Sequence, residues 1–157
     1  MEWGTRPVQR FAMNLHVAED AAESTDPVLE LLRRAKTIAV VGLSSNPRRP
    51  SHEVASYLQS VGYTIIPVNP NERKVLGEKC YARLEDVPVP VDIVDVFRRA
   101  EEVVPVAEAA VRIGAKALWM QLGISNEEAA AKAHAAGLLV VEDACLLVEH
   151  KRRRGAF

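Results

Sequence analysis

The sequence predicts a doubly wound α/β fold, in which a parallel sheet of about five strands carries helices on both faces. Two observations lead to this prediction. Short apolar runs rich in β-branched residues alternate along the chain with segments whose apolar residues recur at helical spacing. The chain has 157 residues, 48% of them hydrophobic, which is enough for one sizeable core and too few for two ordinary domains.

The folded domain is expected to cover residues 26–157, after a loosely held arm over residues 1–25. The arm shows no sustained period and ends in a polar run. Asp26 before Pro27 is typical of a helix start, because aspartate caps free N–H groups and proline fits the first helical position. A short amphipathic helix is therefore expected to open the domain.

The first strand of the sheet is predicted at Thr37–Val41, an apolar run that ends at Gly42. A helical period follows and closes at Gly62. Residues 63–68 form the next predicted strand. Pro67 within it indicates a position where the missing N–H group needs no partner in the sheet.

Three further strand–helix units are predicted in the second half of the chain. Pro105 is compatible with a helix only in its first turn, because it lacks an N–H group. Ser125 and Glu128 have the spacing of a capping box. The expected elements are a strand over residues 91–97, a helix ended by Gly114, a strand over 117–121, a helix ended by Gly137, a strand over 138–141 and a helix over 143–149.

This alternation is typical of a Rossmann-like sheet, with right-handed crossovers between parallel strands. In such sheets ligands bind beyond the carboxyl ends of the strands, near the point where the strand order reverses. The rule selects four loops as the candidate binding site. Their residues are Gly42, Leu43, Ser44, Ser45, Asn46, Pro47, Arg48 and Arg49, then Val68, Asn69 and Pro70, then Phe97 and Arg98, and finally Gln121, Leu122 and Gly123.

The first of these loops carries the strongest signal for an anion. Gly42 allows close approach of the backbone, and Ser44–Asn46 offer donors just before a helix N-terminus. Arg48 and Arg49 add fixed positive charge that suits a pyrophosphate or a further phosphate group. The same residues also fit an ordinary turn with two solvated arginines, and the loop alone does not decide between these interpretations.

Two features argue against a dinucleotide such as NAD. The loop has neither the GxGxxG pattern nor the GxxxxGK[ST] pattern. The second strand and its end, residues 62–70, contain no carboxylate that could accept hydrogen bonds from ribose hydroxyls. A nucleotide with a phosphate on its ribose, such as coenzyme A, would meet no repulsion there.

Several motifs in one order resemble a known family. The chain is similar, over about residues 35–150, to small coenzyme A-binding proteins related to the nucleotide-binding domain of the succinyl-CoA synthetase alpha subunit. The motifs are Val40–Ser44 with Arg49–Ser51, Gly62–Tyr63 with Pro67–Pro70, Val94–Arg98, Trp119–Gly123 with Asn126–Ala129, and Cys145 with Glu149–His150.

The resemblance implies that the four loops contact different parts of the ligand. The loop Gly42–Pro47 would wrap the pyrophosphate of coenzyme A. The turns at Asn69–Pro70, Phe97–Arg98 and Gln121–Gly123 would border its adenosine and pantetheine parts.

No catalytic constellation is identifiable. His52 lies near a helix start and could contact a phosphate, but a surface histidine of the helix without a catalytic role is the favoured interpretation. Asp92 and Asp95 are three residues apart in a strand and so face opposite sides. Glu149 and His150 are adjacent in a helix and point to different faces.

Composition limits the partners and the compartment. The net charge of −1 provides no overall field for nucleic acid or an anionic membrane, and Lys151–Arg154 fit a solvated terminus. Cys80 and Cys145 follow no disulfide or zinc pattern, so reduced thiols in the cytoplasm and no metal are expected. No secretory signal or membrane span is apparent.

The leading hypothesis is a non-catalytic protein that binds coenzyme A or an acyl-CoA. The first alternative is an NAD(P)-linked oxidoreductase, in which Arg48 and Arg49 would meet a nucleotide phosphate. The second alternative is a regulatory subunit of a larger synthetase-like complex. The sequence leaves the protein partner and the oligomeric state open.

Overall fold

The fold is described from a computed structural model, which describes residues 26–157. The arm predicted over residues 1–25 lies outside the described residues. None of the helices within 26–157 is long and apolar enough to cross a bilayer.

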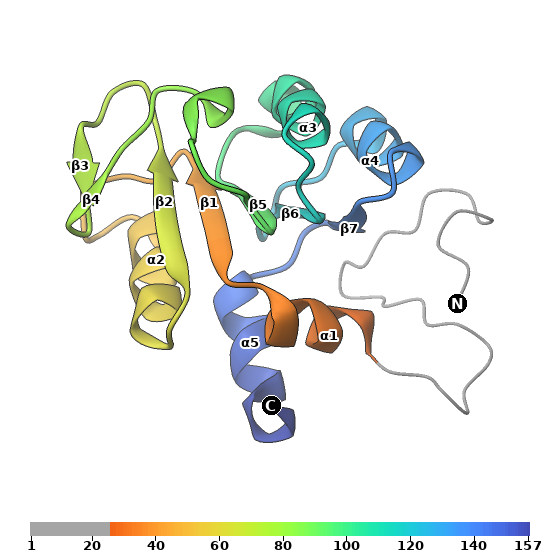
Figure 1. The fold of residues 1–157 in the computed structure, drawn as a ribbon, viewed down its shortest axis with the longest axis horizontal. Coiled ribbons are helices and arrows are strands. Elements are labelled where there is room, and N and C mark those ends of the chain that lie inside the picture. The colour runs from red at the N-terminus through yellow and green to blue at the C-terminus, as the bar shows by residue number, and fades with distance from the viewer. Residues whose placement is uncertain (1–25) are drawn as a thin grey trace.

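A five-stranded parallel sheet forms the centre of the fold, in the order β2-β1-β5-β6-β7 (Figure 1). The chain builds outward from β1 to β2, then returns to the other side of β1 and continues from β5 to β7, so the order reverses between β1 and β5. This confirms the doubly wound, Rossmann-like prediction. The strands are β1 (Thr37–Val41), β2 (Thr64–Val68), β5 (Ile93–Val96), β6 (Ala117–Met120) and β7 (Leu139–Val141).

Helices cover both faces of this sheet, as predicted. In Figure 1, α3 and α4 lie on one face, and α1, α2 and α5 lie on the other. Each face has its own cluster of buried apolar residues, one under α3 and α4 and the other under α1, α2 and α5. The helices are α1 (Pro27–Arg34), α2 (Pro50–Ser60), α3 (Val103–Arg112), α4 (Glu127–Ala135) and α5 (Leu146–Arg153).

The strands are mostly apolar, as expected where both faces of a sheet are buried, and Asp95 of β5 is a buried charged exception. In β1, Ile38 and Val40 belong to the cluster under α2 and α5, whereas Ala39 and Val41 belong to the cluster under α3 and α4. Trp119 of β6 is fully buried, and its indole N–H donates to the Ala144 carbonyl at 2.9 Å. Pro67 lies in β2, an edge strand, where a missing N–H group is tolerated.

Two of the predicted helix starts are confirmed and one is wrong. The Asp26 carboxylate accepts from the Val28 N–H group at 3.0 Å, and Pro105 lies in the first turn of α3. The capping box predicted at Ser125 does not form. Asn126 caps α4 instead, because its side-chain oxygen accepts from the Ala129 N–H group at 2.9 Å.

The last helix begins later than predicted and runs further. The segment before it turns at Asp143, which has a φ of +55° and whose carboxylate accepts from the Gly123 N–H group at 2.6 Å. The helix therefore starts at Leu146. The expectation of a solvated basic terminus is wrong for Arg153, which pairs with Asp26 and, at 2.6 Å, with Glu149.

A small hairpin after β2 was not predicted from the sequence. It joins β3 (Lys74–Val75) to β4 (Glu78–Lys79) through Leu76 and Gly77, which both have positive φ angles, as a two-residue turn of this kind requires. Tyr81, just beyond it, bonds back to the end of β2 through the Pro67 carbonyl at 3.0 Å. Three short 3-10 helices complete the described elements: η3 (Leu84–Asp86), η4 (Ala100–Glu102) and η5 (Arg154–Ala156).

Candidate functional site

The carboxyl ends of the strands bring the four predicted loops to one edge of the sheet. The Gly42 N–H group donates to the Val68 carbonyl, and the Phe97 N–H group donates to the Val41 carbonyl, both at 2.8 Å. The Gln121 N–H group donates to the Val96 carbonyl at 3.4 Å. The loops after β1, β2, β5 and β6 are therefore neighbours at the point where the strand order reverses.

Gly42 is held by a close contact with the loop after β5. Its φ is +90°, and a Cβ atom built on it would lie 2.3 Å from the Phe97 carbonyl oxygen. No side chain fits at that distance without a shift of the backbone. The close approach that the sequence predicts at this glycine is thus made, within the structure, to Phe97.

The first loop is organised by its own polar side chains. Ser51, buried in α2, accepts from the Ser44 N–H group at 3.1 Å. The Ser44 hydroxyl accepts from the Asn46 N–H group, and the Asn46 side chain accepts from the Arg48 N–H group, each at 3.0 Å. These bonds are ordinary turn chemistry, and they present an ordered loop at the start of α2.

Two arginines at the start of α2 form no ion pair within the described part of the chain. Arg48 and Arg49 are exposed, and neither forms an ion pair with any residue of 26–157. Arg49 is the residue that caps α2, and its side chain makes no capping bond. The helix start therefore has two cations available to an anion.

Glu72 is the one functional candidate at this loop that the sequence reasoning missed. Its carboxylate accepts from the Ser45 N–H group at 2.9 Å and from the Ser45 hydroxyl at 2.8 Å. Both bonds hold the pKa of Glu72 below its ordinary value. Glu72 lies two residues beyond the segment 62–70, and its position shortly after β2 is its signal in the sequence.

Asn69 ties the loop after β2 to the first loop. Its side-chain amide donates to the Leu43 carbonyl at 3.0 Å, and its side-chain oxygen accepts from the Asn71 N–H group at 2.9 Å. The Cys80 thiol lies against the Asn69 carbonyl, and burial raises the pKa of Cys80. Asn69 is therefore a positioning residue for both loops.

A cavity of about 270 Å³ lies beside these loops, between the ends of β1 and β2 and helix α3. Three predicted site residues line it: Val68, Pro70 and Arg98. The remaining wall comes from segments that the sequence reasoning did not include. The residues of this wall are Ala82, Arg83, Leu84, Glu85, Pro105, Val106, Ala109 and Arg112, with Val41 from β1.

The charges around this cavity are partly neutralised. Glu85 pairs with Arg112 at 2.5 Å and with Arg83 at 3.7 Å, and the Arg112 hydrogen bond lowers the pKa of Glu85 most. Arg98 pairs with no carboxylate of residues 26–157. It is therefore the cation at this cavity that remains available to a ligand.

The loop after β6 buries Gln121 and exposes Leu122. Gln121 is only 3% exposed, and its amide donates to the buried Asp95 carboxylate at 2.6 Å. The second oxygen of Asp95 has no hydrogen-bond partner in the described part of the chain, and burial raises the pKa of Asp95 to about 7. Leu122, which follows Gln121 in the chain, is 68% exposed. The side chain that this loop presents to solvent is therefore apolar.

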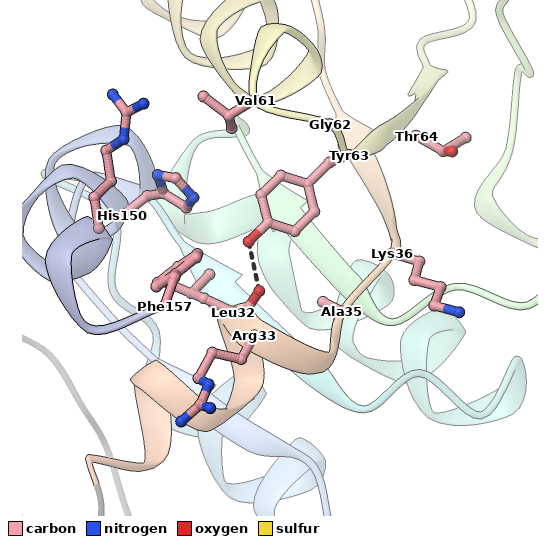
Figure 2. A pocket seen from close by; sticks show the side chains of 11 residues that line it. Leu32, Arg33, Ala35, Lys36, Val61, Gly62, Tyr63, Thr64, His150 and Phe157 are labelled. Carbon is pink, nitrogen blue, oxygen red and sulfur yellow. Dashed lines mark hydrogen bonds between the residues drawn. The ribbon is translucent and has the colours of Figure 1, made fainter.

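A second cavity, of about 550 Å³, lies at the opposite, amino edge of the sheet (Figure 2). Tyr63, His150 and Phe157 form its aromatic wall, and the Tyr63 hydroxyl donates to the Leu32 carbonyl at 2.6 Å. Burial raises the pKa of Tyr63 to about 12. Of the cations that line it, Arg33 and Arg154 sit at the C-terminal ends of α1 and α5, where helix carbonyls favour positive charge.

The carboxyl edge of the sheet suits the binding of an anionic ligand. Within residues 26–157, no group of three or more His, Cys, Asp and Glu side chains is placed to hold a metal ion. The carboxyl edge combines backbone donors, hydroxyl groups, guanidinium groups without an ion pair in residues 26–157, and a cavity lined by apolar and charged side chains. This is the chemistry that a phosphate-bearing nucleotide requires.

Comparison with known proteins also indicates a family of nucleotide-binding domains. The model of a family described as CoA binding domain matches residues 36–151. The uncharacterized protein YneT of Bacillus subtilis is 45% identical over 123 residues, which cover 78% of this chain and 91% of YneT. A solved structure of a hypothetical protein from Pyrococcus horikoshii is 40% identical with a TM-score of 0.79, and the match covers 80% of this chain and 89% of that one.

A longer relative carries a similar segment. The ADP-forming acetate–CoA ligase II of Archaeoglobus fulgidus is 34% identical over 106 residues. This match covers 66% of this chain but only 16% of the ligase.

Proposed function

Since this chain belongs to the CoA-binding domain family, we propose that it binds coenzyme A or an acyl-CoA at the carboxyl edge of β1, β2 and β5. One observation carries the proposal. The four predicted loops meet where the strand order reverses, beside a partly apolar cavity lined by Arg98, which forms no ion pair within residues 26–157.

In this proposal each end of the ligand has a place along the edge. The pyrophosphate lies at Gly42–Pro47, near the free guanidinium groups of Arg48 and Arg49. The adenosine end enters the cavity next to Val68, with Arg98 at its side. The pantetheine arm passes the exposed Leu122, which would lose contact with water on binding.

The proposed role is binding without catalysis. The edge offers donors, cations and apolar walls, and such groups provide affinity rather than turnover unless they act more strongly in a transition state. We expect no thioester when the purified protein is incubated with coenzyme A, ATP, magnesium and short carboxylic acids. Thioester in excess of the protein, lost on substitution of a histidine, would refute the non-catalytic role.

The location of the site is tested by mapping backbone amide shifts in the NMR spectrum during titration with coenzyme A. Shifts are expected at Gly42, Ser45 and Arg98. The amides of Tyr63 and His150, at the cavity of the amino edge, are expected to stay in place. The reverse pattern would move the site to the other edge of the sheet and refute the proposal.

Arg98→Ala provides the matching functional test, with Lys116→Ala as its control. Lys116 is an exposed cation at the amino edge, where its backbone N–H group bonds to Asp92. Loss of a charge-assisted bond at Arg98 should weaken coenzyme A by about tenfold or more, since such bonds contribute about 1.5–3 kcal/mol. Equal affinities of the two variants would exclude Arg98 from the site.

A further inference from the structure

The carboxylate of Glu72 occupies donors in the loop that the proposed function assigns to the pyrophosphate. One of its oxygens accepts from both the N–H group and the hydroxyl group of Ser45, at 2.9 and 2.8 Å. A phosphate oxygen accepts hydrogen bonds from the same kinds of donor at similar distances. In this structure Ser45 thus already binds an anionic oxygen, supplied by the protein itself.

Within residues 26–157, the Glu72 side chain bonds to the first loop only through Ser45. Among the described residues, no Lys, Arg or His side chain forms an ion pair with it. Its N–H group closes a turn to the Asn69 carbonyl at 3.3 Å, which leaves the side chain free to rotate without a change in that turn. A rotation of the side chain is therefore sufficient to release Ser45.

We propose that Glu72 is an internal competitor of the ligand phosphates: its carboxylate occupies Ser45 in the free protein and must leave when a phosphate binds. This inference rests on the proposed function. Its consequence is selectivity, because a small anion gains only the loop contacts and must still displace a negative charge. A long nucleotide gains contacts with the cavity at Val68 and with Leu122 that offset the displacement.

Two other roles for Glu72 predict different behaviour. If the carboxylate stays in place and accepts hydrogen bonds from ribose hydroxyls, its loss weakens nucleotide binding. If it holds a magnesium ion that bridges to a phosphate, its loss abolishes any increase in affinity caused by magnesium. Only the competitor role predicts tighter binding after the carboxylate is removed, with or without magnesium.

The experiment compares Glu72→Gln and Glu72→Ala with the wild-type protein by calorimetric titration of coenzyme A, in EDTA and again with magnesium. Glu78→Gln is the control, because Glu78 is an exposed carboxylate of the neighbouring hairpin. Its side chain forms no ion pair within residues 26–157, and its loss changes the net charge equally. Glu72→Ala should bind about tenfold more tightly, the ratio that corresponds to removal of one charged competitor bond. Glu72→Gln should also bind more tightly than the wild-type protein but by a smaller factor, because its amide oxygen can still accept from Ser45 without a charge. Glu78→Gln should stay within about twofold.

The outcomes separate this inference from the function on which it rests. If the wild-type protein binds coenzyme A and the Glu72 variants bind equally or more weakly, the inference is wrong and the function stands. If neither the wild-type protein nor any variant binds coenzyme A, the proposed function fails and the inference fails with it. Thermal unfolding of each variant verifies that the compared proteins are folded.

Discussion

Substitution of Gly42 by alanine is expected to destabilise the protein through two separable effects. The φ of +90° places the residue where a Cβ atom is unfavourable, at a cost of about 1–2 kcal/mol. The added Cβ atom would also lie 2.3 Å from the Phe97 carbonyl oxygen, and relief of such a contact by movement of packed backbone costs about 1–3 kcal/mol more. The expected loss in the free energy of unfolding is about 2–5 kcal/mol.

Gly137→Ala isolates the effect of the contact. Gly137 has a φ of +93°, nearly that of Gly42, but a Cβ atom built on it meets nothing within 4 Å. Urea unfolding of both variants should therefore show the loss at Gly42 exceeding the loss at Gly137. Equal losses would refute the argument that the loops after β1 and β5 are packed backbone against backbone.

Three further outcomes are expected. Arg49→Ala should weaken coenzyme A and dephospho-coenzyme A equally, each by about 1.5–3 kcal/mol, because both ligands carry the pyrophosphate that Arg49 is proposed to contact; unchanged affinity for both in calorimetric titrations would exclude Arg49 from the site. Asn126→Ala should lower the free energy of unfolding by about 1 kcal/mol because α4 loses its cap, whereas Ser125→Ala should have little effect; a larger loss at Ser125 in urea unfolding would restore the capping box. The raised pKa of Asp95 means that the folded protein binds a proton more tightly than the unfolded chain, so the associated stability is complete below the ordinary pKa of 3.8 and is lost as pH rises through about 7. Asp95→Asn should remove this pH dependence and be more stable than the wild-type protein above pH 7; an unchanged profile of unfolding against pH would contradict the assignment.

The strands and most helix ends were predictable because their signals are local. Thr37–Val41 is an uninterrupted apolar run that ends in a glycine, and it became β1 with the predicted bounds. Pro105 was placed correctly in a first helical turn because its missing N–H group excludes later positions. The order of strands and helices then selected the fold and the edge at which the loops meet.

The errors have tertiary causes. Ser125 and Asn126 are both good capping residues, and the choice between them follows from the contact of the Asn126 amide with the Ala100 carbonyl at 2.8 Å, across the sheet edge. The hairpin of β3 and β4 has two residues in each strand, too few to show an alternating pattern.

The candidate site was predicted in part for a similar reason. Its loops follow from the strand ends, but the amide of Gln121 is directed to Asp95 and the carboxylate of Glu72 to Ser45, and both choices depend on residues distant in the sequence. The walls contributed by η3 and α3 likewise have no signature in the sequence near the predicted loops.

The central claim, a coenzyme A site at the carboxyl edge of the sheet, is tested most directly by calorimetric titration of the purified, nucleotide-free protein with coenzyme A, NAD and NADP under one set of conditions. The account predicts saturable binding of coenzyme A at one site per chain, tighter than the binding of either dinucleotide. Binding of NAD or NADP with equal or higher affinity would contradict it.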